Sequence, residues 1–392
     1  MEINPYNVLI DRSGTNAEKY ALRTHLFGTD EVRPMWVADM DIATPEYVLE
    51  AVKKRLNHPV MGYEIMPDAA YEAQIGWFAR HHAFIMKRQW LSYSPSVVAS
   101  LGCTIRALSE EGDEVIVMDP VYPPFYATVK HNRRTLLVHP LRRDAEGVYR
   151  FDLDLLASQV TSRTKLLLLC SPHNPLGRVW SRQELEALGA FCLDRGIRIV
   201  SDEIHCDLVY APNRHLPTAS LSDALRENTV MLIGPGKTFN MAGFSISTVC
   251  IPSEELRERY DAERKRLHWG EGALLSHVAF EAAYARGDAW HAGLMDHLAG
   301  NAEAIASWAS SQNAIGYRKP EGTYLAWLDC RALGMGDREL RDFFVREARL
   351  GLSPGLGFGK EGSGFMRLNF AVPRSVLEEA LESMGRAIDG TR

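Results

Sequence analysis

The middle of the chain alternates short apolar runs with longer stretches of helical periodicity, and this alternation strongly limits the folds it can adopt. In the helical stretches, such as residues 182–195, apolar side chains recur at the spacing of one helix face. The apolar runs are mainly β-branched and aliphatic, and they lie at 114–118, 165–169, 197–200, 230–233 and 248–251. This order predicts an α/β fold with a mostly parallel, doubly wound sheet between two layers of helices.

The pattern changes after about residue 253, where helical stretches dominate and strand-like runs return only near the C-terminus. We expect helices at 254–267, 273–286, 289–311, 337–350 and 375–388, and strands near 323–328 and 365–370. The change predicts a large domain over residues 46–289 and a smaller α+β domain over 290–392. Residues 1–45 are expected to be a segment that packs with the small domain. A chain of 392 residues is long enough for two domains.

Composition and charge exclude several classes of function. The formal net charge is −6 and the basic runs are short, which argues against nucleic acid as a partner. Residues 1–11 carry charges and no apolar core, so we expect no signal peptide. No stretch reaches the roughly 20 apolar residues of a membrane span, so we expect a cytoplasmic protein with no membrane partner.

Cysteines and histidines give no sign of a metal centre. The six cysteines contain no Cys-x-x-Cys pair, and several lie in apolar runs, so we expect them to be small buried hydrophobes. His81, His82 and His131 have no metal-ligand spacing with other candidates. We therefore expect no metal in the function of this chain.

Four polar turns are associated with the predicted strands, at 120–124, 171–177, 201–205 and 234–240. They carry Tyr122, Asn174, Asp202 and Lys237. Ligands of doubly wound sheets bind outside the carboxyl ends of the strands, where these turns would meet. An aromatic ring, an amide, a carboxylate and an amine at one sheet edge suit pyridoxal 5′-phosphate (PLP) better than any other cofactor.

Each of these residues also has a simpler interpretation. Most lysines are solvated, but the glycines before Lys237 allow close backbone approach, and Thr238 adds a polar group. Asp202 could cap a helix, or it could pair with a pyridine nitrogen and keep it protonated. Asn174 could be a turn residue or a donor to the phenolic oxygen of the cofactor. Tyr122 could pack in the core or stack on the ring. Their occurrence together, in this order, favours the cofactor site.

Several motifs of the sequence resemble those of a known family. Ser-Pro-x-Asn-Pro-x-Gly at 171–177, Ser-Asp-Glu-Ile-His at 201–205 and Lys-Thr-Phe-Asn at 237–240 resemble fold-type I PLP enzymes of the class I/II aminotransferase family. The segments 34–41, 62–63 and 120–124 resemble more specifically its MalY/PatB-type cystathionine β-lyases, or C–S lyases. The resemblance covers essentially the whole chain and implies the PLP-dependent transferase-like fold.

The resemblance also implies roles for individual residues. Lys237 would be the Schiff-base lysine and would act in catalysis with Tyr122 and Asp202. The helix opened by residues 95–98 would present backbone amides to the cofactor phosphate, as helix N-termini do for anions. The implied cofactor-binding residues are Lys237, Asp202, Asn174, Tyr122, His205, Val97, Val98, Tyr63 and Thr238. The implied substrate-binding residues are Arg367, Val37 and Tyr63.

Two of these residues have wider consequences. Tyr63 would reach the phosphate of the neighbouring subunit, which implies a homodimer with shared active sites. Arg367 stands among apolar strand residues, where a guanidinium needs an anionic partner and can grip a carboxylate with two hydrogen bonds. That partner would be the substrate α-carboxylate; the alternative is a structural ion pair with an Asp or Glu.

The chain departs from the family pattern at two positions. Many members carry a hydroxyl residue three positions before the lysine, where this chain has Gly234. Aspartate aminotransferases carry an arginine eight residues after it, where this chain has Ser245. Both positions would help to hold the phosphate, and we expect Thr238 and Tyr63 to compensate.

The resemblance implies a carbon–sulfur β-lyase that acts on a small-molecule amino acid. The substrate would be L-cystathionine or a related S-substituted L-cysteine, and the products a thiol, pyruvate and ammonia. An aminotransferase of L-amino acids is the alternative, because it would use the same residues. A regulatory protein that keeps the fold without physiological catalysis is a third interpretation, since fold alone does not imply activity.

Overall fold

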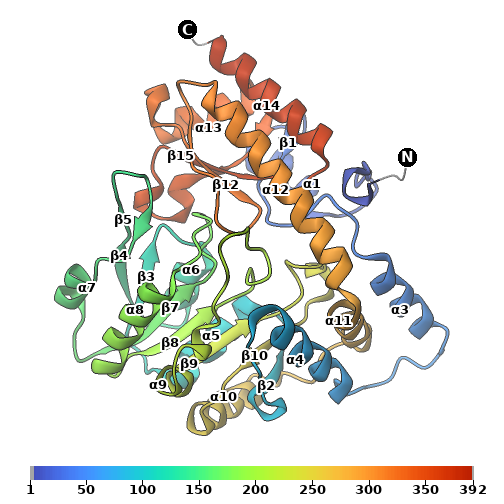
Figure 1. Ribbon diagram of the computed structural model, residues 1–392, viewed down its shortest axis with the longest axis vertical. Helices are drawn as coiled ribbons and strands as arrows, with labels where there is room; N and C mark the ends of the chain where they lie inside the picture. The colour runs from blue at the N-terminus through green and yellow to red at the C-terminus, as the bar shows by residue number, and fades with distance from the viewer. Residues whose placement is uncertain (1–3, 391–392) are drawn as a thin grey trace.

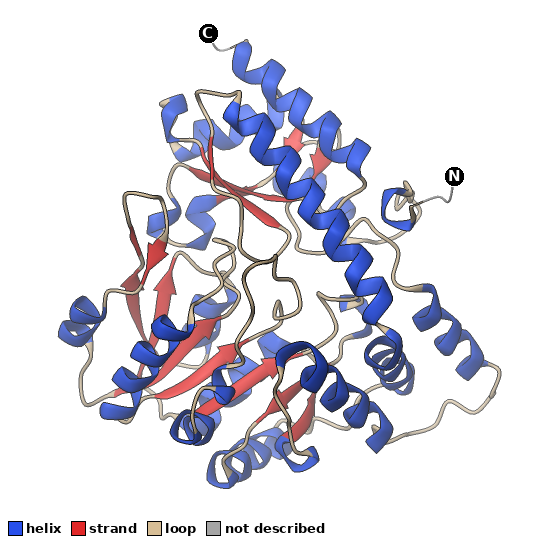
Figure 2. Cartoon of the chain, viewed as in Figure 1, coloured by secondary structure: helices blue, strands red, loops and turns tan. Residues whose placement is uncertain are grey.

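The computed structural model describes residues 4–390, which form a seven-stranded sheet, a four-stranded sheet and two two-stranded sheets (Figures 1 and 2). The large sheet has seven strands in the order β2-β10-β9-β8-β7-β3-β4. Its strands are β2 Leu91–Ser94, β3 Glu114–Asp119, β4 Thr135–Pro140, β7 Thr164–Cys170, β8 Arg198–Asp202, β9 Thr229–Ile233 and β10 Ser247–Cys250. Strands β4, β3, β7, β8 and β9 are parallel, whereas β10 runs antiparallel to β9 and β2. The predicted α/β fold with a mostly parallel sheet is confirmed.

Alternate residues of the central strands enter two separate apolar layers. Leu166 and Leu168 pack on one face of the sheet with helices α5, α6 and α10, whereas Leu167 and Leu169 pack on the other face with α7, α8 and α9. The helices are α5 Val97–Leu108, α6 Pro124–His131, α7 Leu153–Gln159, α8 Arg182–Asp194, α9 Asp223–Asn228 and α10 Glu254–Arg266. Because both faces are covered, the strands need apolar side chains on both sides, which explains their continuous apolar runs.

Three further helices cover one face of the sheet at the end formed by β9, β10 and the edge strand β2. The helices α3 Glu46–Leu56, α4 Asp68–His82 and α11 Leu274–Arg286 contribute to one apolar cluster with residues of β9 and β10. Trp77 and Phe78 of α4 and Phe280 of α11 are fully buried in this cluster. The cluster packs against strands β9, β10 and β2, next to the turn that carries Lys237.

The small sheet lies in the upper part of Figure 1 and has the order β11-β12-β15-β14. Its elements and the helices around it are β11 Gly316–Tyr317, β12 Leu325–Asp329, β14 Ser353–Pro354, β15 Phe365–Asn369, α12 Asp288–Ser310, α13 Asp337–Arg346 and α14 Arg374–Asp389. Met35, Met40 and Ile42 of the N-terminal segment share an apolar cluster with these elements. The predicted limit near residue 290 falls in the first turn of α12, and the division into domains stays a prediction.

The remaining short elements lie at the periphery of the two sheets. They are α1 Glu18–Ala21, α2 Arg23–Phe27, β1 Arg33–Pro34, β5 Arg142–Arg143, β6 Tyr149–Arg150 and β13 Leu350–Gly351. Strand β1 pairs in parallel with β13, so it ties the N-terminal segment to the C-terminal part of the chain. This pairing leads the chain directly into residues 36–44.

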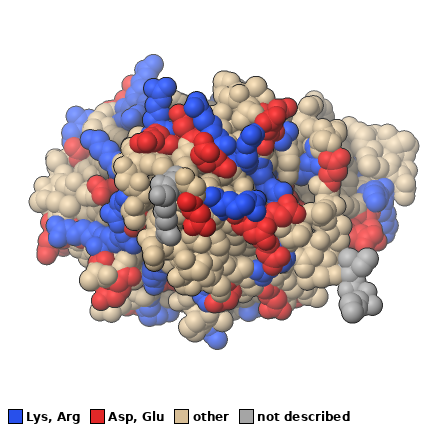
Figure 3. Space-filling model, turned by 90° about the horizontal axis from the view of Figure 1, so that it is seen from above, with Lys and Arg blue, Asp and Glu red and all other residues tan. Residues whose placement is uncertain are grey.

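The surface and the cysteines agree with the composition. On the face shown in Figure 3, acidic and basic side chains are interspersed and form no continuous basic stripe. None of the helices in residues 4–390 has the length and apolar character needed to cross a membrane. All six cysteines are buried and unpaired, as predicted.

Candidate active site

A cavity of about 190 Å³ lies at the carboxyl ends of the central strands. It is lined by Ala38, Pro95, Ser96, Val97, Val98, Tyr122, Cys170, Asn174, Asp202, Ile204, His205, Gly236, Lys237, Ala242, Ser245, Ile246 and Ser247. Tyr122 follows β3, Asn174 follows β7, Asp202 ends β8 and Lys237 follows β9. The structure therefore brings these four sequence-predicted side chains into one cavity, because parallel strands end at the same sheet edge.

Lys237 is partly buried, and its amine donates a hydrogen bond to the carbonyl of Ala38 at 2.6 Å. Burial, followed by the positive charge of Arg367, lowers the pKa of Lys237 from 10.5 to about 8. A lysine with this pKa is partly neutral near neutral pH, and only a neutral amine can attack a carbonyl carbon. The amine is thus prepared for Schiff-base chemistry.

Asp202 is buried at the end of β8, and its Oδ1 accepts a hydrogen bond from the backbone N–H of Ile204 at 3.1 Å. Burial raises the pKa of Asp202 to about 7, although the backbone hydrogen bond and the charge of Lys237 oppose the shift. A carboxylate in this position gains from a cationic N–H partner. The protonated ring nitrogen of a pyridine cofactor has that character.

Arg367 on β15 reaches the cavity through Asn174, because its Nη1 donates to Asn174 Oδ1 at 3.0 Å. Its Nη2 donates to the carbonyl of Trp36, and its Nε is buried without a partner among residues 4–390. No Asp or Glu of the described chain pairs with it, and burial lowers its pKa to about 10. Within residues 4–390 the structural ion pair that the sequence left open is not seen, and a cation with neutral partners is able to take a carboxylate.

His205 and Tyr122 are neutral groups of the cavity wall. Burial, reinforced by Lys237 and Arg367, lowers the pKa of His205 well below its usual value. Its Nδ1 is buried and has no hydrogen-bond partner within residues 4–390. Burial and the charge of Asp202 raise the pKa of Tyr122, so the phenol keeps its proton. An unpartnered buried nitrogen in a cavity wall is suited to a polar atom of a ligand.

One end of the cavity is built by the N-terminus of α5. Ser96 caps this helix by accepting a hydrogen bond from the N–H of Ala99 at 3.1 Å, and Val97 and Val98 form its first turn. The free N–H groups and the helix dipole favour an anion at such a position. Ser245 and Ser247 also line the cavity, and the residues that line it include no cation other than Lys237.

Four sequence-predicted residues do not line the cavity: Arg367, which reaches it through Asn174, and Thr238, Val37 and Tyr63. Thr238 is fully buried, and its hydroxyl donates to Asp207 Oδ2 at 2.6 Å rather than facing the cavity, so its contact with the phosphate stays a prediction. Val37 offers its backbone carbonyl to Asn369, while its neighbour Ala38 faces the cavity. Tyr63 is fully exposed on the surface of the chain.

Sequence reasoning missed several residues of the wall, among them Ala38, Cys170, Ile204 and Ser247. The backbone of residues 36–40 is the most extensive of these omissions. The carbonyl of Trp36 accepts from Arg367, and the carbonyl of Ala38 accepts from both Lys237 and Tyr324. Backbone groups leave no trace in a sequence motif, so only the fold could reveal these contacts.

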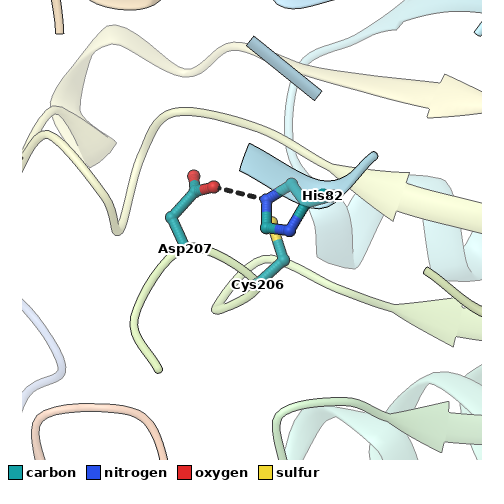
Figure 4. Close-up of side chains that lie close together, drawn as sticks. All are labelled: His82, Cys206 and Asp207. Carbon is teal, nitrogen blue, oxygen red and sulfur yellow. Dashed lines mark hydrogen bonds and ion pairs between the residues drawn. The ribbon is translucent and has the colours of Figure 1, made fainter. Parts of the chain in front are cut away.

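A buried cluster of hydrogen bonds centred on Asp207, called the Asp207 hub below, explains the position of the Thr238 side chain. Figure 4 shows His82 directed at Asp207, with Cys206 beside it. One imidazole nitrogen, the thiol sulfur and one carboxylate oxygen of these residues, the atoms that could ligate a metal, lie within 4.8 Å of one another. Asp207 Oδ1 accepts from His82 at 2.7 Å and from Trp77 at 2.8 Å, while Oδ2 accepts from Thr238. Sequence spacing gave His82 no such neighbours. Because protein donors already satisfy both oxygens, this geometry is that of a structural hydrogen-bond hub.

The chain is similar to known proteins over nearly its full length. The profile described as aminotransferase class I and II matches residues 37–384. Cystathionine beta-lyase PatB of Bacillus subtilis (strain 168) is 37% identical over 96% of this chain and 98% of its own length. The structure of cystalysin from Treponema denticola, which contains a pyridoxal 5′-phosphate cofactor, superposes with a TM-score of 0.96 at 30% identity over all of both chains. A PLP-bound C–S lyase from Staphylococcus hominis superposes with a TM-score of 0.90 at 31% identity, covering 98% of this chain and 97% of the other.

Proposed function

Because the chain belongs to the class I and II aminotransferase family, we propose that it is a PLP-dependent carbon–sulfur β-lyase. The substrate is L-cystathionine or a related S-substituted L-cysteine, and the products are a thiol, pyruvate and ammonia. The observation that carries the proposal is the partly buried amine of Lys237, with its lowered pKa, in one cavity with Asp202. The full-length similarity to PatB, cystalysin and a C–S lyase supports the choice of reaction.

The side chains of the cavity fit PLP at each of its functional groups. The amine of Lys237 suits the aldehyde, and Asp202 suits the ring nitrogen. Tyr122 offers a ring face, and the unpartnered Nδ1 of His205 offers a polar contact. The N-terminus of α5 suits the phosphate. When bound, the cofactor supplies an electron sink for the electron pair left when the Cα–H bond of the substrate breaks.

The residues of this chain would bind and orient the substrate as follows. Arg367 holds the α-carboxylate by exchanging its neutral carbonyl partner for a charged one. Lys237 removes the Cα proton as a general base. The C–S bond then breaks, the thiolate leaves from Cβ, and a Cα=Cβ double bond forms. Addition of water to the released enamine product yields pyruvate and ammonia.

The second candidate is an aminotransferase, which the family name itself supports. Both reactions begin with loss of the Cα proton, and they differ in whether the Cβ substituent leaves. The purified protein incubated with L-cystathionine, without any added keto acid, distinguishes the two. We expect stoichiometric pyruvate and thiol, and none from the variant Lys237→Ala. If product formed only when a keto acid was supplied, the aminotransferase would be favoured and the lyase rejected.

We further propose that two subunits share each active site. Tyr63 lies in a loop with the exposed apolar side chains of Val60, Met61 and Ile65, and exposed apolar clusters mark interaction surfaces. In a homodimer this loop would place Tyr63 at the phosphate of the partner. Mixing inactive Tyr63→Ala with inactive Lys237→Ala should restore activity, because one site of the mixed dimer has both native residues. A mixture that stayed inactive after subunit exchange would contradict shared sites.

A further inference from the structure

We propose that Ser247 provides a hydroxyl contact to the cofactor phosphate and that Gly234 is the residue that makes room for it. This inference rests on the proposed PLP site and deepens it. It concerns the end of the cavity formed by the N-terminus of α5, where Ser96, Ser245 and Ser247 line the wall. With no arginine among the lining residues, an anion there depends on helix amides and hydroxyl donors.

The strand register places Ser247 beside both Gly234 and the anion end. Thr248 pairs with Ile233 across β10 and β9, so the preceding Ser247 lies next to Gly234. On its other side, Ser247 is paired with Ser94 of β2, three residues before α5 begins. Ser247 therefore lies between the turn that carries Lys237 and the helix terminus that attracts the anion.

A side chain at position 234 would lie very close to Ser247. A Cβ atom at position 234 would lie 3.0 Å from the Cβ and 3.1 Å from the Cα of Ser247. Contacts this short require β10 to give by a few tenths of an ångström at Ser247, so a side chain at 234 would crowd the one at 247. Because residue 234 has no side chain, Ser247 forms the cavity wall at this point.

The hydroxyl of Ser247 is available for a stronger partner than it has now. It donates to the carbonyl of Ser94 at 3.3 Å, which is long for a hydrogen bond from a hydroxyl group. A phosphate oxygen is charged, and hydrogen bonds to charged acceptors are shorter and stronger than those to neutral ones. The same O–H can therefore turn from the carbonyl to the phosphate without any backbone rearrangement.

The test compares binding of PLP with binding of pyridoxal, which lacks the phosphate. Holoenzyme is stripped of cofactor and titrated with each compound, with absorbance of the bound form as the readout. For Ser247→Ala we expect the Kd for PLP to rise about tenfold, the loss typical of one hydrogen bond to a charged group. The Kd for pyridoxal should not change. Ser220→Ala, which removes a hydroxyl bonded to the carbonyl of Pro217 outside the cavity, is the matched control and should bind both compounds like wild type.

A side-chain exchange tests the spatial argument. Gly234→Ser alone should weaken PLP binding, because its Cβ crowds Ser247. The double variant with Gly234→Ser and Ser247→Gly should bind PLP more tightly than Ser247→Gly alone, since it returns one hydroxyl to the same space. If Ser247→Ala bound PLP like wild type, or lost PLP and pyridoxal affinity equally, the inference would be overturned. Wild-type protein that bound neither compound would instead overturn the proposed PLP site, and this inference with it.

Discussion

Single residues of the cavity show how burial sets protonation. The pKa of Asp202 is raised to about 7 and the pKa of Lys237 is lowered to about 8, so the two values approach each other. Desolvation is the first cause for both, because each loses water around its charged form. Near neutral pH the cavity can therefore exchange protons with a ligand at a small cost in free energy.

These shifts predict a pH dependence of stability in the cofactor-free protein. Between pH 3.8 and about 7, folded Asp202 keeps a proton that the unfolded chain loses, so the free energy of unfolding falls as pH rises. Between about 8 and 10.5, unfolded Lys237 keeps a proton that the folded chain lacks, so the free energy of unfolding rises with pH. Urea denaturation of wild type against Asp202→Asn and Lys237→Met should isolate each window. Identical pH profiles for wild type and Asp202→Asn would contradict the first assignment.

Substitution of Arg367 tests its role as the carboxylate partner. Lysine keeps the positive charge but loses the planar pair of donors, so Arg367→Lys should lower kcat/KM by roughly 100-fold, about 3 kcal/mol. The control substrate is the carboxamide analogue of the amino acid, which should be used equally poorly by both proteins. An unchanged KM for the carboxylate substrate would remove Arg367 from substrate binding.

The residue scale also shows what sequence could predict. Tyr122, Asn174, Asp202 and Lys237 were found because each follows a strand, and parallel strands end together. The hydrogen bond of Thr238 to Asp207 could not be predicted, because Asp207 lies 31 positions away along the chain and belongs to no recognisable pattern with it. Ser247 was missed because a serine in an edge region of a sheet carries no distinctive signal.

At the scale of elements, Asp207 holds three parts of the fold together. It follows β8, it accepts from Trp77 and His82 of α4, and it accepts from Thr238 in the turn after β9. Through Thr238 it fixes the turn that carries Lys237 relative to the strand that carries Asp202. The predicted strands and helices agree with the structure to within a few residues, but the hub that links them was not visible in any single element.

Removing this hub should cost stability. Asp207→Asn removes the charge that three donors share, and we expect a loss of about 3 kcal/mol in the free energy of unfolding. Thr238→Val removes one donor and should cost about 1–2 kcal/mol, whereas Thr238→Ser should be close to wild type because it keeps the hydroxyl. Chemical denaturation of the three variants provides the measurement. Equal stability of the valine and serine variants would show that the hydroxyl is not the stabilising group.

At the scale of the whole molecule, a charge network near the cavity ties the N-terminal segment together. Lys19 is fully buried and pairs with Asp41 at 2.8 Å, and Arg12 bridges Asp41 and Asp39 at 2.7 and 2.8 Å. These pairs hold the segment whose carbonyls contact Lys237 and Arg367. We expected residues 1–45 to pack with the small domain, but nothing in the sequence pattern predicted buried ion pairs there.

Breaking the buried pair should loosen this segment. Asp41→Asn leaves the ammonium of Lys19 with only the more distant carboxylate of Asp39, at 3.5 Å, and we expect the free energy of unfolding to fall by about 3 kcal/mol. Combining it with Lys19→Met should recover part of the loss, because the uncompensated charge is gone. The measurement is a double-mutant cycle by urea denaturation. Additive losses in the double variant would indicate that the two side chains do not interact.

The carbonyls of Trp36 and Ala38 have a consequence for how this region tolerates change. They contact Lys237, Tyr324 and Arg367 through peptide oxygens that every amino acid possesses. A library of point substitutions at these two positions would therefore leave the acceptors in place and underestimate their importance. Deleting or inserting one residue between 36 and 39 would shift every acceptor out of register, and such a length change should be far more damaging than any replacement.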